Sequence, residues 1–251
     1  MKDVMNKIPQ ITLAFWVMKI CATTLGETAG DLLSMTLNVG YTISSIILLS
    51  FFFATLVLQF ISKKYLPFVY WAVILSTSTA GTTISDYIDR TLGLGYLTGS
   101  LILVTLLVTT LIIWRATEKS LSVTNIKSFR GEFYYWVAIL FSNTLGTALG
   151  DFLADNSGLG FEGGAILIGS LLFVIVLVYY YTKVSRVLLF WLAFVLTRPF
   201  GATFGDLLTK PLSKGGLNFG TIGSSAILFG ILMILIIVSI IKLNREVQIE
   251  A

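Results

Sequence analysis

Residues 16–31 read WVMKICATTLGETAGD, an apolar stretch that begins with a tryptophan and ends with an aspartate. The pattern occurs three more times, at residues 71–86 (WAVILSTSTAGTTISD), 136–151 (WVAILFSNTLGTALGD) and 191–206 (WLAFVLTRPFGATFGD). In every copy the tryptophan lies 15 residues before the aspartate, and the copies use four of the five tryptophans. Such internal repetition indicates that one structural unit occurs four times in the chain.

The composition is typical of a membrane protein. Hydrophobic residues make up 56% of the chain and charged residues 12%, whereas soluble domains carry about 25% charged residues. A membrane-spanning helix needs about 20 mostly apolar residues. Stretches of this kind cover residues 11–33, 41–61, 66–88, 96–114, 131–153, 163–182, 186–208 and 219–241. We therefore predict an all-α integral membrane bundle of eight transmembrane helices, with the lipid bilayer as its partner.

Basic residues are distributed unequally between the two sets of connections. Twelve lie in the terminal segments and in every second connection: Lys2, Lys7, Lys63, Lys64, Arg115, Lys119, Lys127, Arg130, Lys183, Arg186, Lys242 and Arg245. The alternate connections hold three, Arg90, Lys210 and Lys214. Because basic residues are enriched in cytoplasmic loops, we expect both termini in the cytoplasm. This topology explains the net charge of +4 without a nucleic-acid partner.

Each repeat holds two of the apolar stretches, so each is predicted to form a two-helix hairpin. Two crossings return the chain to the same side, so all four hairpins should have one orientation. The aspartates are spaced by 55, 65 and 55 residues, with the widest gap between repeats two and three. We predict two pseudo-symmetric halves, residues 1–115 and 131–251, joined by a cytoplasmic linker at residues 116–130.

No catalytic motif is evident. The chain has one cysteine, Cys21, and no histidine, which argues against a zinc or copper centre and an intrachain disulfide. The sequence contains no phosphate-binding loop, dinucleotide fingerprint or nucleophile elbow. We therefore expect neither an enzyme nor a covalently bound cofactor.

The aspartates of the four repeats are the main candidates for a site. An ionised side chain at the centre of a transmembrane helix costs about 2.5–3.5 kcal/mol on insertion scales. Tryptophan favours the membrane interface, and a helix rises about 1.5 Å per residue, so the aspartates should lie near the outer end of their helices. Parallel repeats place them at one depth. We expect them to share one interior volume, and with Glu27 they form the predicted cation and metal ligands: Asp31, Asp86, Asp151 and Asp206.

Threonines precede the aspartates at helical spacing. Positions three, four and seven before each aspartate hold Thr24, Thr28, Thr79, Thr82, Thr83, Thr144, Thr147 and Thr203. These positions share the aspartate's face of a helix, although such hydroxyls also bond to their own backbone. A site of carboxylate and hydroxyl oxygens suits Mg²⁺, Ca²⁺ or Mn²⁺.

The charges within the first helix of each repeat do not balance. Five acids face two bases, Lys19 and Arg198, which leaves −3 if all are ionised. Either cations bind there or some carboxylates hold protons. Lys19 is a counter-ion or extends back to the interface. Arg198 precedes Pro199, which interrupts the backbone hydrogen bonds, and we assign it a counter-ion or gating role.

Small residues lie five residues before and one residue before each aspartate. They are Gly26, Gly30, Gly81, Ser85, Gly146, Gly150, Gly201 and Gly205. This spacing lets transmembrane helices approach closely. We predict closest approach between helices at Gly30, Gly150 and Gly205.

The combination of tryptophan, G-x-x-x-G/S-D and a glycine nine residues on (Gly40, Gly95, Gly160) resembles a bacterial family of inner-membrane proteins. That family is built of repeats of about 55 residues of unknown function. The resemblance covers nearly the whole chain and implies an eight-helix protein of the bacterial inner membrane, without naming a substrate. In repeat four we take Gly220 as the corresponding glycine, which lengthens the loop by five residues. GETAGD is also loosely similar to the E-x-G-D-[KR]-[ST] signature of Ca²⁺ or Mn²⁺ exporters, but the base after the aspartate is missing.

The leading hypothesis is a transporter for a hard cation, Mn²⁺, Ca²⁺ or Mg²⁺, exchanged for protons. The metal ion would be its substrate. A cation channel that uses the same residues as its filter is an alternative. Another is a non-transporting scaffold or sensor whose aspartates pair with Lys19, Arg198, Arg90 and Lys210. The sequence leaves a homo-oligomer open.

Overall fold

The computed structural model describes residues 7–126 and 128–250, so Lys2 and Lys127 lie outside the described residues. Eight long helices are present: α1 (Leu13–Asp31), α2 (Tyr41–Ile61), α3 (Pro67–Asp86), α4 (Gly95–Glu118), α5 (Phe129–Asp151), α6 (Gly160–Tyr181), α7 (Arg186–Thr209) and α8 (Thr221–Glu250). Short 3₁₀ turns cover Val123–Asn125 and Leu212–Lys214. Within the described residues there is no strand, and the prediction of an all-helical chain is confirmed.

Six of the helices are long and apolar enough to cross a membrane, namely α2, α4, α5, α6, α7 and α8. The other two, α1 and α3, are rich in hydroxyl and charged residues. Almost all of their polar side chains are buried against other helices, so these two helices have little contact with the surroundings of the bundle. Several spanning helices make this a membrane protein.

The first helices of the four repeats form a closed inner ring. In it, α1 packs on α3, α3 on α5, α5 on α7 and α7 on α1. Gly26 and Gly30 of α1 lie against Ser78 and Thr82 of α3, so residue numbers rise together along the two helices. The three other contacts of the ring have the same register. The four helices are therefore parallel, as the hairpin repeats predict.

Glycines allow this close approach. A Cβ atom placed on Gly30 would lie 2.8 Å from the Cβ of Thr82, and one on Gly150 would lie 2.7 Å from the Cβ of Ala202. At Gly205 it would lie 3.0 Å from the Cβ of Glu27. These three glycines lie at tight helix contacts, as predicted, but the closest approach is one turn earlier. A Cβ atom at Gly26, Gly146 or Gly201 would lie 2.4, 2.3 or 2.6 Å from its nearest neighbour. Contacts that recur every fourth residue are typical of right-handed crossings of about −40° between small-residue helices.

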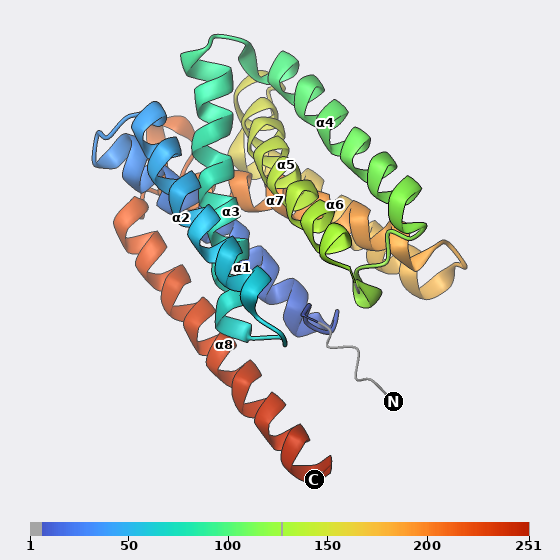
Figure 1. Cartoon of the computed structure of the whole chain (residues 1–251). Helices are drawn as coiled ribbons and strands as arrows, with labels where there is room; N and C mark the ends of the chain where they lie inside the picture. Colours follow the sequence, from blue (N-terminus) through green and yellow to red (C-terminus); the bar gives the residue numbers. More distant parts are fainter. Residues whose placement is uncertain (1–6, 127, 251) are drawn as a thin grey trace.

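The second helices of the repeats form an outer layer that is displaced by one repeat. Helix α2 packs on α3, α4 on α5, α6 on α7, and α8 returns to cover α1 (Figure 1). The two helices of one repeat thus follow each other in sequence, but the second helix packs mainly on the inner helix of the next repeat. Both ends of residues 116–130 are helical, since α4 ends at Glu118 and α5 begins at Phe129.

An aromatic level occupies the end of the ring opposite the aspartates. Sixteen residues before each aspartate lie Phe15, Tyr70, Tyr135 and Phe190, all buried. Each packs against the repeat tryptophan of the next repeat in a tilted or edge-on arrangement, with ring centroids 5.6–6.4 Å apart. Three of these tryptophans, Trp71, Trp136 and Trp191, are buried inside the bundle. These three tryptophans pack against neighbouring inner helices and do not face the outside of the bundle as interfacial tryptophans do. Their depth in the membrane stays a prediction.

A π-helical turn directly follows the aspartate in the first three repeats. These turns are Leu32–Thr36, Tyr87–Thr91 and Phe152–Asn156. In repeat four, α7 instead continues to Thr209 and is followed by the longer loop. π-Helical turns inside helices occur frequently at functional sites.

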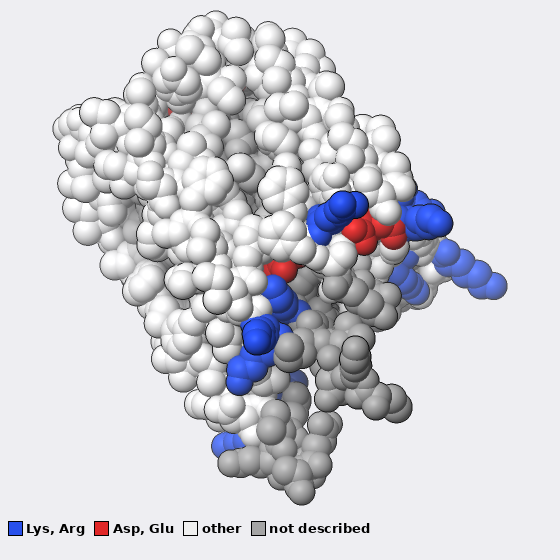
Figure 2. Space-filling model, viewed as in Figure 1, with Lys and Arg blue, Asp and Glu red and all other residues white. Residues whose placement is uncertain are grey.

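Exposed basic side chains are unevenly distributed over the face shown in Figure 2. On the face shown in Figure 2, basic side chains cluster at the end where α8 finishes, and the rest of that face is almost free of charge. The last turns of α8 extend beyond the other helices at this end (Figure 1).

Candidate functional site

The four aspartates lie at the end of the inner ring opposite the aromatic level, and all are buried. They form two pairs, each bridged by one base. Lys210 Nζ lies 2.5 Å from Asp31 Oδ2 and 3.1 Å from Asp206 Oδ1. Arg90 lies 2.9 Å from Asp86 Oδ1 and 3.2 Å from Asp151 Oδ2.

Both bridging bases follow the same rule. Each lies four residues after the aspartate of its own repeat and also reaches the aspartate of the next repeat around the ring. The side chains of Lys210 and Arg90 are 19% and 33% exposed, whereas the aspartates are nearly inaccessible. The bases therefore lie between the buried carboxylates and the surroundings.

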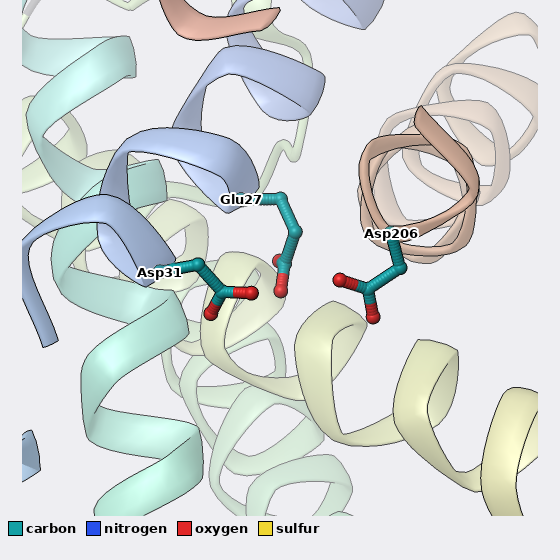
Figure 3. A group of neighbouring side chains, drawn as sticks. All are labelled: Glu27, Asp31 and Asp206. Carbon is teal, nitrogen blue, oxygen red and sulfur yellow. The ribbon is translucent and has the colours of Figure 1, made fainter. Parts of the chain in front are cut away.

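A third carboxylate joins one of the pairs. Glu27 and Asp31 of α1 and Asp206 of α7 turn toward one another, and each offers an oxygen within 4.8 Å of the others (Figure 3). The position four residues before the aspartate, which Glu27 occupies, holds Thr82, Thr147 and Ala202 in the other repeats. The acidic cluster is therefore found at the α1–α7 contact only, among the described residues.

Arg198 connects this cluster to the middle of the ring. Its Nη2 atom donates to Glu27 Oε2 at 2.9 Å and to the hydroxyls of Thr82 and Thr147, both at 2.6 Å. It also lies 3.4 Å from the carbonyl oxygen of Ser78. The predicted counter-ion role of Arg198 thus has a defined partner, Glu27. Pro199 lies inside α7 directly after it.

Lys19 lies deeper, near the aromatic level. Its side chain is fully buried and does not extend to either end of the bundle. The ammonium donates to Asn143 Oδ1 at 3.3 Å and lies 4.1 Å from the centre of the Phe194 ring. Asn143 in turn donates to Thr77 at 2.9 Å.

The interior is organised in levels spaced by four residues. Eight residues before the aspartates lie Thr23, Ser78, Asn143 and Arg198, and twelve before lie Lys19, Ile74, Ile139 and Phe194. All eight are buried. Each repeat contributes one residue to each level, and the levels differ in chemistry because the repeats have different residues there.

Most of the predicted threonines bond to their own helix. Backbone carbonyl oxygens accept from the hydroxyls of Thr24, Thr28, Thr79, Thr83, Thr144 and Thr203. Thr82 and Thr147, four residues before their aspartates, contact Arg198, and Thr82 also bonds to Ser78 O of its own helix. The face that reaches the charged groups is thus the one at four-residue spacing.

The structure adds two bases to the predicted site. Arg90 and Lys210 contact the carboxylates, so the five acids face four bases and the predicted charge of −3 becomes −1. The signal was in the sequence, since both bases follow an aspartate by four residues. Sequence alone did not indicate that each would also reach a second aspartate.

This arrangement can hold and exchange positive charge. Carboxylates this close repel one another unless a proton or a cation lies among them, and a lysine side chain is flexible and displaceable. The oxygen ligands of Glu27, Asp31 and Asp206 suit a hard divalent ion.

Comparison with known proteins identifies a family. No curated protein and no solved structure matches this chain. A family model described as a Repeat of Unknown Function (DUF347) matches residues 14–65, 69–120, 134–185 and 189–242. Each match covers one inner helix and the outer helix after it, and together they cover most of the sequence. The chain therefore belongs to this repeat family, with four copies of the repeat.

Proposed function

We propose that the protein is a secondary transporter that exchanges a hard divalent cation, Mn²⁺, Ca²⁺ or Mg²⁺, for protons. The cation would bind to Glu27, Asp31 and Asp206. The observation that carries this proposal is the position of Lys210, whose ammonium lies between two carboxylates of a buried three-carboxylate cluster. In this conformation Lys210 takes the place that a metal ion would take.

The charges of the aspartate pairs support exchange. Each pair carries two negative charges when ionised and faces one basic side chain, so each lacks one positive charge. A proton on one carboxylate corrects this, and so does a divalent ion that displaces the base. Intramembrane carboxylates with such partners are typical of ion and proton pathways.

The closed aromatic level favours a transporter over a channel. The hydroxyls of Tyr70 and Tyr135 meet at 2.7 Å inside it, and its four side chains are buried. Access to the carboxylates would then come from the end where Lys210 and Arg90 are partly exposed. A filter in an open channel would need a path through the aromatic level.

We further propose that all eight helices cross the bacterial inner membrane, with both termini in the cytoplasm. Helices α1 and α3 are parallel to α5 and α7 in one ring, so they cross the same distance although their composition is more polar. Labelling with a membrane-impermeant thiol reagent in a Cys21→Ser background tests the topology. Lys214→Cys should react in intact cells, and Lys63→Cys should react after permeabilisation only. The reverse result would invert the proposed orientation.

Metal binding to purified protein tests the site. A ligand that binds the folded state raises Tm, so Mn²⁺, Ca²⁺ or Mg²⁺ should stabilise the unmodified protein. Lys210→Met should enlarge this shift because it removes the competing ammonium, and Asp206→Asn should reduce it. Lys214→Met removes the same charge from an exposed position on the same loop and should leave the shift unchanged.

The proton partner is tested by pH and by flux. Acidification should shrink the metal-induced rise in Tm, because protons compete for the carboxylate oxygens. Proteoliposomes that contain a metal-sensitive dye should show uptake of the bound ion. Protons should move in the opposite direction and change the internal pH. Metal binding without flux in either direction would reject transport.

A scaffold is the second candidate, because every aspartate is held in an ion pair. In that case no metal ion should shift the Tm of the unmodified protein or of the Lys210→Met variant. The variant should simply be less stable, because two buried carboxylates have lost their base. This pattern would replace the transport proposal.

A further inference from the structure

Two cationic side chains lie in the interior of the ring, between the carboxylates and the aromatic level. Lys19 and Arg198 are both fully buried. Arg198 is paired with Glu27 at 2.9 Å, whereas Lys19 forms no ion pair with any residue that the structure describes. Its ammonium has one hydrogen bond, to Asn143, and lies over the face of Phe194. If Lys19, Arg198 and Glu27 are all ionised, their charges sum to +1.

Both cations keep unused donors. The four acceptors around Arg198 all contact Nη2, and Nε and Nη1 have no partner among the described residues. A guanidinium has five N–H donors and an ammonium has three, so several remain without an acceptor. The hydroxyl of Ser78 is likewise buried without a partner among the described residues. Buried donors on a charged group are costly to leave unpaired.

These groups occupy neighbouring levels of one axis. Arg198, Ser78 and Asn143 lie eight residues before their aspartates, and Lys19 lies twelve before its own. At about 1.5 Å per residue this separates the two levels by about 6 Å. Helices α1 and α7, which carry the two cations, are in direct contact.

We propose that this region binds a small monovalent anion, such as chloride, between the Lys19 ammonium and the free N–H groups of Arg198. One negative charge neutralises the cluster and accepts several hydrogen bonds. The tight packing favours a small ion, because a Cβ atom added at Gly26 would lie 2.4 Å from Ser78 and one added at Gly146 would lie 2.3 Å from Arg198. The anion site uses none of the proposed cation ligands, although Arg198 also contacts one of them, Glu27.

Chloride binding to the purified protein tests this site. Protein in sodium gluconate is titrated with sodium chloride at constant sodium, and bound ³⁶Cl⁻ and Tm are measured. We expect saturable binding of one chloride per chain and a saturable rise in Tm. Lys19→Met should abolish both and still fold in gluconate, because the neutral Glu27–Arg198 pair remains. Lys63→Met removes an exposed charge elsewhere and should bind chloride normally.

A second measurement covers the case in which Lys19→Met does not fold. Crystals of the unmodified protein grown in bromide should show an anomalous peak between Lys19 and Arg198. Absence of that peak, or chloride binding that survives Lys19→Met, would overturn the proposal. Lys210→Met should keep full chloride binding, which separates this site from the cation site.

Discussion

The substitution Gly201→Ala tests the contact that closes the inner ring. A Cβ atom at this position would lie 2.6 Å from Thr23 Oγ1 and 2.8 Å from the backbone carbonyl carbon of Thr23. The hydroxyl of Thr23 is itself held, because it donates to Thr197 O at 3.1 Å and to Lys19 O at 3.0 Å. The new methyl group therefore fits only if α1 and α7 move apart.

The expected change in the free energy of unfolding is the difference between a steric cost and a gain in helix propensity. Overpacking of a well-packed contact costs about 1–3 kcal/mol. Replacing a helical glycine with alanine stabilises the helix by up to about 1 kcal/mol, because alanine has the higher helix propensity. The net loss is up to about 2 kcal/mol, and since 1 kcal/mol corresponds to about 2–4 °C in a chain of this size, Tm should fall by up to about 8 °C.

Thermal unfolding in detergent, followed by tryptophan fluorescence, measures this loss. Gly230→Ala is the matched control: Gly230 lies in α8, and a Cβ atom there has no neighbour within 4 Å. The control should be as stable as the unmodified protein or slightly more stable. If Gly201→Ala matches Gly230→Ala, α1 and α7 do not meet as described, and the cluster of Glu27 and Asp206 loses its basis.

Two further predictions concern buried polar pairs. Arg198→Met and Glu27→Gln should each destabilise the protein by up to about 3–5 kcal/mol, because each disrupts a buried ion pair; the double variant should lose less than the sum, and strict additivity in a thermal double-mutant cycle would rule out the pair. In the aromatic level, Tyr70→Phe and Tyr135→Phe should each cost about 1–3 kcal/mol, because the partner hydroxyl is left buried without a bond. The double Phe variant should be close to the unmodified protein, and a loss as large as the sum of the single losses would show that the hydroxyls do not pair.

Much of the architecture could be predicted from the repeated pattern. Four equivalent stretches with small residues one and five residues before an aspartate indicate four equivalent, closely packed helices. Which inner helix each outer helix packs on could not be predicted. A short connection between the two helices of a repeat does not fix this, because the second helix can cover either its own inner helix or the next one. That choice depends on side-chain packing between repeats, such as Phe15 against Trp71.

The helical period explains why the site was only partly predicted. An isolated helix repeats every 3.6 residues, which makes Thr24 and Thr28 plausible companions of Asp31. Small-residue helices that cross at a steep right-handed angle contact at every fourth residue instead. The ring therefore presents Glu27 and Thr23 inward at the next two levels, and the hydroxyl of Thr24 bonds to its own backbone.

The differences between the repeats are concentrated where the first and last repeats meet. Glu27, Asp31 and Lys19 belong to α1, whereas Arg198, Asp206 and Lys210 belong to α7 or follow it directly. The ion pairs across this contact join residues 171 and 179 positions apart in the chain. Repeats two and three supply neutral side chains at the levels of Glu27 and Lys19, namely Thr82, Thr147, Ile74 and Ile139. An inner helix α1 inserted alone would carry Lys19, Glu27 and Asp31 without their partners on α7. The buried charges of Glu27 and Asp31 are compensated only when repeat four closes the ring, so these ion pairs and the closed ring must form together.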